Sequence, residues 1–293
     1  MDNMKILVIN PYRGIGDLIF HLPLFRGLYE KYKSRIILIT NESNKAKFIL
    51  KNEFSISKII YLKFTRENLI NNSINLLNKI NSYKSDICVV TAYSKRLSIP
   101  LYLSNSKNKK IFRKSSNKNL SEYILEQSNM QFPNINFLKN YKINFSNKHY
   151  TKNIFVSLDS FHDQNNWDQN NFIELINKLI NKKFFIYINF SPNKINTFRK
   201  TINLFRKKRK IFFTYSKKFH EIIKYISNSK YVIGNESGPI CLGASLNKII
   251  FSIYDPVYTP KLSSKIINNK INYLNSKILN KDKIINLIID KLN

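Results

Sequence analysis

The chain has 293 residues, 43% of them hydrophobic, and 49 Lys and Arg against 18 acidic residues give a formal net charge of +31. This length suits one large domain or two ordinary ones, and the composition excludes long-range disorder. No run of about 18 apolar residues predicts a transmembrane helix, and two cysteines cannot form a disulfide framework or a zinc site. With no secretory leader recognisable at the start, we expect a cytoplasmic protein.

Short apolar runs alternate with helical periods in the first half of the chain. We predict strands at residues 5–10, 36–40 and 87–90, and helices at 17–32 and 69–80. Residues 104–119 are interpreted as a loop, either alone or with a short strand at 110–113, and residues 133–152 as an interdomain linker. A short strand that is apolar throughout, such as residues 5–10, is typical of a parallel sheet covered on both faces.

The same alternation returns after the linker. We predict strands at residues 154–158, 184–188, 211–214, 231–233 and 248–253, and helices at 172–180, 194–205, 219–227, 239–246 and 281–292. The alternation predicts an α/β fold with two Rossmann-like parallel-sheet domains facing a cleft, residues 1–150 and 151–293. The last helix could also pack back on the first domain.

Glycine is scarce, and five of the six glycines fall in two segments, Arg13–Asp17 and Gly234–Gly243. Each segment follows a predicted strand and precedes a predicted helix, which is where α/β sheets bind ligands. Glycine allows a tight turn with positive φ and the close approach of a ligand. The first segment lacks the third glycine of a dinucleotide fingerprint. From its spacing, Asp17 is either a helix cap or a group that faces a ligand.

The second segment reads Gly234-Asn235-Glu236-Ser237-Gly238-Pro239. Proline at the first helical position predicts a helix N-terminus at this turn, and its free N–H groups and positive dipole end suit a diphosphate. Glu236 would repel phosphate, so we expect it to face sugar hydroxyls. A plain turn between strand and helix is the alternative.

A third polar cluster, residues 159–167, follows the first strand of the second half. We interpret Trp167 as a packing anchor for the helix that begins near Phe172, with a base-stacking platform as the alternative. We interpret His162 as a surface residue, with a ligand contact as the alternative. His21 lies one turn after Asp17, either on the ligand side of its helix or partly buried. Four scattered histidines predict no metal site.

The charge has three explanations. Lys far outnumbers Arg and is spread over the whole chain, as the codon bias of an AT-rich genome would produce. The second explanation is contact with an anionic inner membrane, and the third is nucleic acid, whose binders usually gather Arg and aromatic residues on one face. The densest basic run, residues 206–210, is interpreted as a solvated turn. We therefore expect no nucleic-acid partner and keep a peripheral membrane contact open.

Three segments together resemble glycosyltransferase family 9, which contains the ADP-heptose:lipopolysaccharide heptosyltransferases. Residues 13–26 resemble the family's opening, residues 232–244 its second signature, and residues 163–167 its Lys-x-Trp segment. The sequence departs from the family at Glu236, usually aspartate, at Cys241, usually histidine, and at Asn165, usually lysine. The resemblance implies the GT-B fold, with the donor bound mainly by the second domain.

The resemblance also implies an activity: inverting, metal-independent transfer of heptose from ADP-heptose to a sugar hydroxyl of a lipopolysaccharide core or related glycan. The nucleotide sugar is then a co-substrate, with no other cofactor, and the acceptor is lipid-linked or of lipopolysaccharide type. The catalytic base would be Asp17; the donor would contact Ser160, Asn165, Glu236, Ser237, Gly238 and Pro239; the acceptor would contact Arg13, Gly14, Gly16 and His21. The alternatives are another nucleotide sugar, a catalytically inactive binding module and a basic nucleic-acid-binding protein.

Overall fold

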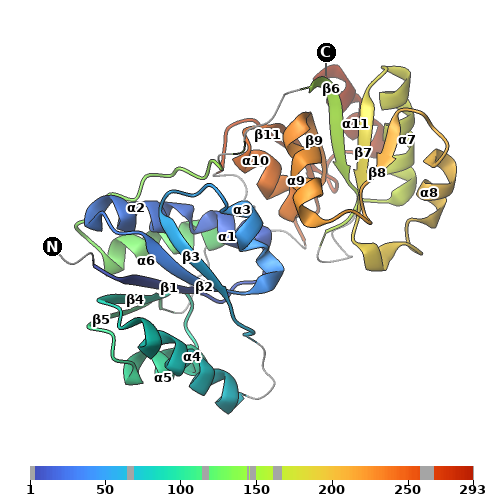
Figure 1. Ribbon diagram of the computed structural model, residues 1–293. Helices are drawn as coiled ribbons and strands as arrows, with labels where there is room; N and C mark the ends of the chain where they lie inside the picture. Colours follow the sequence, from blue (N-terminus) through green and yellow to red (C-terminus); the bar gives the residue numbers. More distant parts are fainter. Residues whose placement is uncertain are drawn as a thin grey trace. The chain divides into compact units, whose positions relative to one another are not determined.

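The chain divides into two compact units, Met1–Ile143 and Asn144–Asn293. The computed structural model describes residues 4–64, 69–113, 119–143, 145, 150–160, 167–257 and 267–292 (Figure 1). The division falls inside the predicted linker, a few residues before the predicted boundary at 150. Both units are parallel α/β structures, as predicted, and each is described below by itself.

The first unit contains a five-stranded sheet of order β3-β2-β1-β4-β5, in which all neighbouring strands are parallel. The strands are β1 Ile6–Asn10, β2 Ile36–Thr40, β3 Ile56–Tyr61, β4 Ile87–Val90 and β5 Asn108–Ile111. Every residue of β1 and β4 is buried, because helices cover both faces of the sheet at its centre (Figure 1). This burial explains the continuous apolar runs in the two strands.

Six α-helices of the described residues surround this sheet. They are α1 Ile15–Phe20, α2 Leu22–Tyr32, α3 Ala46–Ile49, α4 Leu69–Tyr83, α5 Lys95–Leu103 and α6 Leu120–Gln131, with a 3-10 turn η1 at Glu42–Asn44. The single helix predicted over 17–32 is wrong, because the chain breaks into two helices at His21. Pro23 explains the break, since proline has no N–H to donate to the carbonyl of Ile19 and its ring clashes there.

The second unit contains a six-stranded parallel sheet of order β11-β10-β9-β6-β7-β8. The strands are β6 Tyr150–Ser157, β7 Phe185–Asn189, β8 Ile211–Phe213, β9 Ser229–Asn235, β10 Ile249–Tyr254 and β11 Ile271–Asn275. The helices are α7 Gln169–Asn181, α8 Arg199–Phe205, α9 Phe219–Asn228, α10 Gly238–Ser245 and α11 Lys281–Asp290, with a 3-10 turn η3 at Pro192–Lys194.

The terminal helix α11 belongs to the core of the second unit. Its residues Ile284, Ile285 and Ile288 are fully buried in the same cluster as Phe172 and Leu175 of α7. None of the helices in the described parts of the chain is both long and apolar enough to cross a bilayer.

The order of strands creates one switch point in each sheet. In the first unit the chain moves outward from β1 to β2 and β3, and then crosses to β4 on the other side of β1. In the second unit it moves from β6 to β7 and β8, and then crosses to β9 on the other side of β6. Ligands of open α/β sheets bind outside the carboxyl ends of the strands at such points. The loops that follow β1, β6 and β9 are the three segments singled out from the sequence.

Candidate active site

Asp17 is the third residue of α1 and bonds back to the helix start. Its Oδ2 accepts a hydrogen bond of 2.9 Å from the backbone N–H of Gly14, the N-cap residue. Burial raises the pKa of the Asp17 carboxyl above its ordinary value, and the bond from Gly14 opposes this rise. In the described part of the chain, the other oxygen, Oδ1, has no hydrogen-bond partner. The carboxylate thus caps the helix through Oδ2, and its Oδ1 can accept a further hydrogen bond or a proton.

Gly14 is needed for space and not for an unusual backbone conformation. Its φ of −79° and ψ of 149° are extended, and a Cβ at this position would lie 2.6 Å from Asp17 Oδ2. None of the six glycines, all within the described ranges, has a positive φ. The expectation of positive φ was therefore wrong; the close contact at Gly14 is with the Asp17 carboxylate, and the close approach of a ligand stays a prediction.

The loop after β2 fixes the backbone that precedes Gly14. The Asn44 side chain is fully buried and donates to the Tyr12 carbonyl at 3.2 Å. The Ser43 hydroxyl donates to the Arg13 carbonyl at 2.9 Å. The Arg13 side chain is exposed. This arrangement holds the turn rigidly and leaves the guanidinium in solvent, where an anionic ligand can reach it.

His21 has no exposed surface and lies between two aromatic rings. Its ring centroid is 5.5 Å from that of Tyr12 and 6.0 Å from that of Phe25. Nδ1 lies 2.6 Å from the Asp17 carbonyl oxygen, so Nδ1 carries the proton and donates it. Burial lowers the pKa of His21 to about 4, and the imidazole is neutral at physiological pH. His21 and the buried Gly16, both predicted to contact the acceptor, thus lie behind the turn, while Arg13 and Gly14 lie at its surface.

In the second unit, Ser237 is the N-cap of α10 but makes no capping bond. Its hydroxyl oxygen is buried and has no hydrogen-bond partner among the described residues. Gly238 is the first helical residue of α10 and Pro239 the second. The prediction had placed the proline at the first helical position. The N–H groups of Gly238 and Ile240 have no carbonyl partner within the helix. A serine hydroxyl normally caps such a helix start, so the missing capping bond leaves donors for an anion at the positive end of α10.

The carboxylate of Glu236 is held just before this helix start. Its Oε2 accepts a hydrogen bond of 2.5 Å from the Ser252 hydroxyl of β10. Its backbone N–H donates to the Ile253 carbonyl at 3.1 Å, which extends the pairing of β9 with β10. The carboxylate is therefore fixed at the carboxyl ends of these two strands, close in sequence to the uncapped serine.

Asn235 joins the two loops of the second switch point, although the sequence analysis gave it no role. Its buried side chain donates to the Leu158 carbonyl at 2.7 Å and accepts from the Trp167 N–H at 2.8 Å. It thereby clamps both ends of the loop after β6. Asn165 and His162, which were considered from the sequence, lie in residues 161–166, outside the described residues. The feature that could have indicated the role of Asn235 is a side-chain amide at the end of a buried central strand.

Lys194 is the second residue that sequence reasoning missed. It lies in the η3 turn after β7, where a helix had been predicted, and its Nζ donates to the carbonyl of the buried Ser160 at 3.2 Å. The same Nζ lies 3.8 Å from Asp159 Oδ2, which accepts from the Ser191 N–H at 3.0 Å. The fold thus brings a cation from a neighbouring loop to the predicted donor-binding serine.

Trp167 and Gly234 are structural parts of this region. Trp167 packs edge-on against Phe172, with ring centroids 5.0 Å apart, which confirms its interpretation as a packing anchor. Gly234 pairs with Ser157 between β9 and β6, and a Cβ at Gly234 would collide with the Ser157 carbonyl oxygen. Glycine at this position allows the two central strands to lie side by side at the switch point.

Two parallel α/β units, each with charged or hydroxyl side chains at its switch point, have the architecture of a two-domain glycosyltransferase. Residues 84–288 match the model of glycosyltransferase family 9 (heptosyltransferase), and the chain belongs to this family. The resemblance noted from the sequence is thereby confirmed. The Arg13–Asp17 turn lies outside the matched range. A search of curated proteins found no match.

Solved structures of similar fold extend the comparison over the whole chain. An ADP-heptose lps heptosyltransferase II of E. coli superposes with a TM-score of 0.78 at 13% identity, covering 99% of this chain and 98% of that chain. A family 9 glycosyl transferase from Veillonella parvula gives 0.76 at 16% identity, covering 95% and 88%. The E. coli heptosyltransferase WaaC with ADP-2-deoxy-2-fluoro heptose gives 0.70 at 12% identity, covering 98% and 100%. These similarities show that the chain has the heptosyltransferase fold.

Proposed function

We propose that this glycosyltransferase moves a heptose from ADP-heptose to a sugar hydroxyl of a lipopolysaccharide core or related glycan. The transfer inverts the anomeric configuration and uses no metal. The observation that carries the proposal is the buried, unpartnered hydroxyl of Ser237 at the uncapped start of α10. The fold neighbour solved with ADP-2-deoxy-2-fluoro heptose supports the choice of donor.

The second unit holds the donor. Its diphosphate accepts hydrogen bonds from the Ser237 hydroxyl and from the Gly238 and Ile240 N–H groups, in the field of the helix end. Lys194 adds a positive charge beside Ser160, on the opposite side of the switch point. The charge that develops on the leaving ADP is stabilised by these fixed groups, which take the place of a metal.

The sugar of the donor is recognised by Glu236. One carboxylate oxygen is held by Ser252, and this bond fixes the plane in which the carboxylate accepts hydrogen bonds from sugar hydroxyls. Pro239 keeps the first turn of α10 rigid, and Asn165 contributes a further contact to the donor. The Asn235 clamp holds Leu158 and Trp167 in place for donor binding.

The first unit supplies the base and the acceptor contacts. Oδ1 of Asp17 takes the proton of the acceptor hydroxyl, whose oxygen then attacks the anomeric carbon as the bond to the diphosphate breaks. The raised pKa of Asp17 makes it a stronger base than an exposed carboxylate. The exposed Arg13 binds a phosphate or carboxylate of a lipid-linked or lipopolysaccharide-type acceptor, with Gly14 at the surface beside it. Gly16 and His21 position the turn from behind.

Calorimetric titration with ADP-heptose tests the proposal at Ser237. Ser237→Ala removes a hydroxyl that bonds only to the ligand, so the dissociation constant should rise about tenfold, the scale of one hydrogen bond to a charged group. Ser245→Ala in the same helix is the matched control, because the Ser245 hydroxyl already donates to the Leu242 carbonyl at 2.8 Å. Equal affinities of the wild type and Ser237→Ala would refute the assignment.

The outcome of the transfer is tested separately. NMR of the product formed in the presence of EDTA should show the anomeric configuration opposite to that of the donor. Retention of configuration, or complete loss of activity with the chelator, would contradict the proposed mechanism. If the enzyme prefers another nucleotide sugar in the same assay, that sugar is the donor instead of ADP-heptose, and the proposed transfer reaction still holds.

A further inference from the structure

Helices α4 and α5 pack side by side on one face of the first sheet, and both are apolar on two sides. Their inner residues Leu76, Ile80, Leu97 and Leu101 are buried in the core with β1 and β4. Five large apolar residues of the same helices are between 49% and 76% exposed: Ile70, Ile74, Ile99, Tyr102 and Leu103. A surface helix usually keeps its apolar residues toward the core and polar ones outside. The outer apolar residues therefore need a separate explanation.

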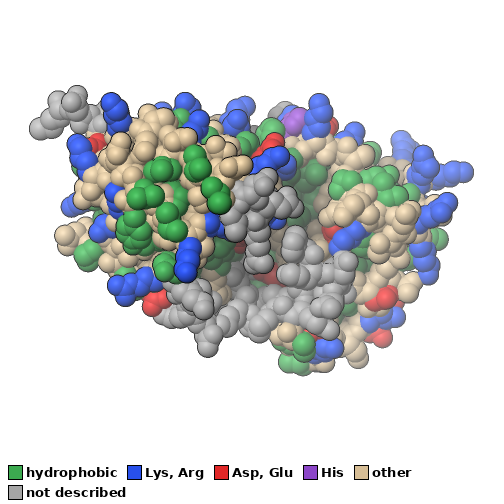
Figure 2. Space-filling model, turned by 90° about the horizontal axis from the view of Figure 1, so that it is seen from below, with side chains coloured by type: hydrophobic (Ala, Val, Ile, Leu, Met, Phe, Trp, Pro, Cys, Tyr) green, Lys and Arg blue, Asp and Glu red, His purple; other side chains and the backbone are tan. Residues whose placement is uncertain are grey.

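A groove of about 370 Å³ runs between the two helices. It is lined mainly by apolar side chains, namely Ile70, Ile74, Leu77, Ile99, Pro100 and Leu103, with Ser73, Lys95 and Arg96. We call this groove with its exposed neighbours the α4–α5 face. In Figure 2, hydrophobic side chains gather in one group at the left of the view, with Lys and Arg side chains around it. A contiguous apolar area of this kind marks an interaction surface.

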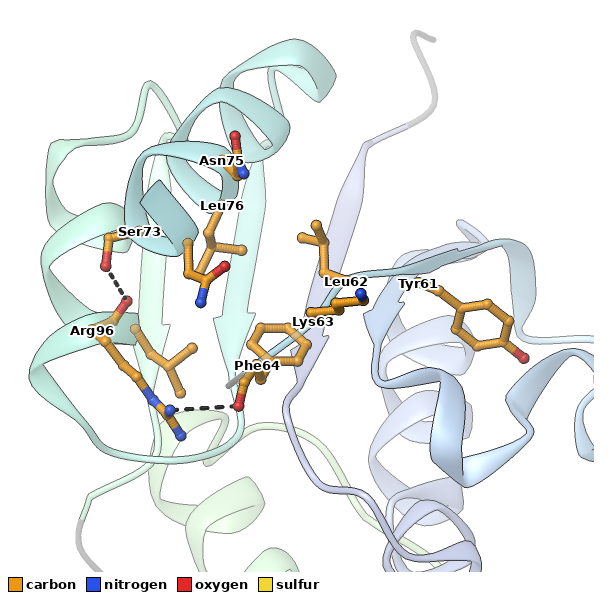
Figure 3. A pocket seen from close by; sticks show the side chains of 10 residues that line it. Tyr61, Leu62, Lys63, Phe64, Ser73, Asn75, Leu76 and Arg96 are labelled. Carbon is orange, nitrogen blue, oxygen red and sulfur yellow. Dashed lines mark hydrogen bonds between the residues drawn. The ribbon is translucent and has the colours of Figure 1, made fainter. Parts of the chain in front are cut away.

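The charges on the α4–α5 face are all of one sign. The two helices carry Lys79, Lys95 and Arg96 and contain no aspartate or glutamate. Arg96 is held at the edge of the groove, because its guanidinium donates to the Phe64 carbonyl at 3.4 Å (Figure 3). The Ser73 hydroxyl of α4 donates to the Arg96 carbonyl at 3.3 Å and ties the two helices together. The face thus combines exposed apolar side chains with fixed and exposed cations.

We propose that the α4–α5 face binds an anionic lipid leaflet. Exposed isoleucine and leucine side chains enter the interfacial region of the bilayer, while Lys95 and its neighbours meet the lipid phosphates. A second copy of the chain fits this face less well, since a two-fold interface would bring its cations together with no acidic partner on either helix. This inference goes beyond the proposed function and does not depend on the donor.

Co-sedimentation of the full chain with lipid vesicles tests the inference. The wild type should bind vesicles of phosphatidylcholine with about 30% phosphatidylglycerol, and binding should fall as salt rises. The double variant Ile99→Ser/Leu103→Ser should bind at least about tenfold more weakly, because two inserting side chains are lost. The matched control is Ile195→Ser/Leu204→Ser, which changes two exposed apolar residues of the second unit and should bind like the wild type.

A second pair of variants separates this face from the general charge. Lys95→Glu on α5 should weaken binding to anionic vesicles several-fold more than Lys207→Glu in the exposed turn at 206–210. Equal effects of the two exchanges would overturn the inference, as would equal binding to pure phosphatidylcholine. A concentration-dependent dimer that Ile99→Ser/Leu103→Ser dissociates, seen by light scattering, would assign the face to a second copy instead. Thermal unfolding of each variant shows that the loss does not come from misfolding.

Discussion

At the start of α1, Asp17 and His21 lie one helical turn apart and have different roles. The Asp17 side chain accepts a hydrogen bond from the Gly14 N–H through Oδ2, while the fully buried His21 donates to the Asp17 carbonyl. The sequence placed both residues in one segment but could not separate these roles. Burial decides between them, and burial depends on Tyr12 and Phe25, whose rings enclose the imidazole.

Asp17→Asn should separate capping from catalysis. The amide oxygen of asparagine can still accept the Gly14 N–H, so the free energy of unfolding should change by less than about 1 kcal/mol. Asparagine cannot take a proton, so kcat should fall about a hundredfold or more while the donor dissociation constant is unchanged. The wild-type kcat/KM should also fall on acidification as Asp17 is protonated, above the ordinary carboxyl range because its pKa is raised. Near-normal turnover in the variant would return Asp17 to the role of a cap.

His21 should make the fold sensitive to acid. Its pKa is about 4 in the folded chain against 6.5 for an ordinary histidine, so the unfolded chain binds the proton first. Stability from this group is therefore complete above about pH 6.5 and is lost as pH falls toward 4, by about 1.4 kcal/mol per pH unit. Urea unfolding of His21→Gln should lack this loss. The same exchange at the half-buried His220 controls for the substitution, and parallel pH curves for wild type and His21→Gln would contradict the prediction.

Lys194 should matter for donor binding, and thermal unfolding of the variant measures its separate effect on the fold, since its Nζ also lies 3.8 Å from the buried Asp159 carboxylate. Lys194→Met removes the cation beside Ser160 and keeps an unbranched apolar side chain, so the dissociation constant for ADP should rise about five- to tenfold. Lys200→Met is the control, because Lys200 bonds Asn170 at the exposed surface at 2.7 Å. Calorimetric titration of both variants checks the prediction. An effect of the same size in Lys200→Met would show that only the general charge of the chain is involved.

At the scale of elements, the sequence predicted the buried strands better than the edges. β1, β2 and β4 are continuous apolar runs and lie close to their predicted bounds. β3 and β11 are edge strands of mixed burial, and their weaker patterns were not recognised. Helices α5 and α6 were also missed, since α5 contains Pro100 and α6 lies within a polar stretch. In a short edge strand, where only part of one face is buried, the alternation of apolar and polar residues is too weak to predict a strand.

A buried ion pair joins α2 to other parts of the first unit. The guanidinium of Arg26 contacts both oxygens of Glu53, at 2.7 and 3.2 Å. It also donates to the carbonyls of Asn140 and Lys142, shortly before the end of the unit. Arg26, the last residue of the segment that resembles the family's opening, therefore has a structural role, which its sequence position alone could not reveal.

Arg26→Leu should destabilise the first unit strongly. The variant leaves Glu53 buried without its partner, and the free energy of unfolding should fall by about 3–5 kcal/mol. The double variant Arg26→Leu/Glu53→Leu removes the unpaired charge and should recover part of that loss. Chemical denaturation of the three proteins provides the measurement. If the two single exchanges lowered the free energy of unfolding additively in the double variant, the two residues would not act as a pair.

At the scale of the whole molecule, sequence and structure agree on two parallel α/β units and on family 9. The three motifs lie in the loops after β1, β6 and β9, at the switch points of the two sheets, because strand order sets where these carboxyl ends lie. They could not predict Asn235 as a clamp or Lys194 as a neighbour of Ser160, since both contacts join loops distant in sequence. The basic run at 206–210 forms a largely exposed turn between α8 and β8, as expected.

The central claim is that the start of α10 binds the diphosphate of a nucleotide sugar. A crystal structure of the protein soaked with ADP tests it most directly, and ADP-heptose can follow in the same crystals. We expect phosphate oxygens within hydrogen-bond distance of the Ser237 hydroxyl and the Gly238 N–H, at about 2.7–3.2 Å. A nucleotide bound elsewhere, with the Ser237 hydroxyl still without a partner, would contradict the account.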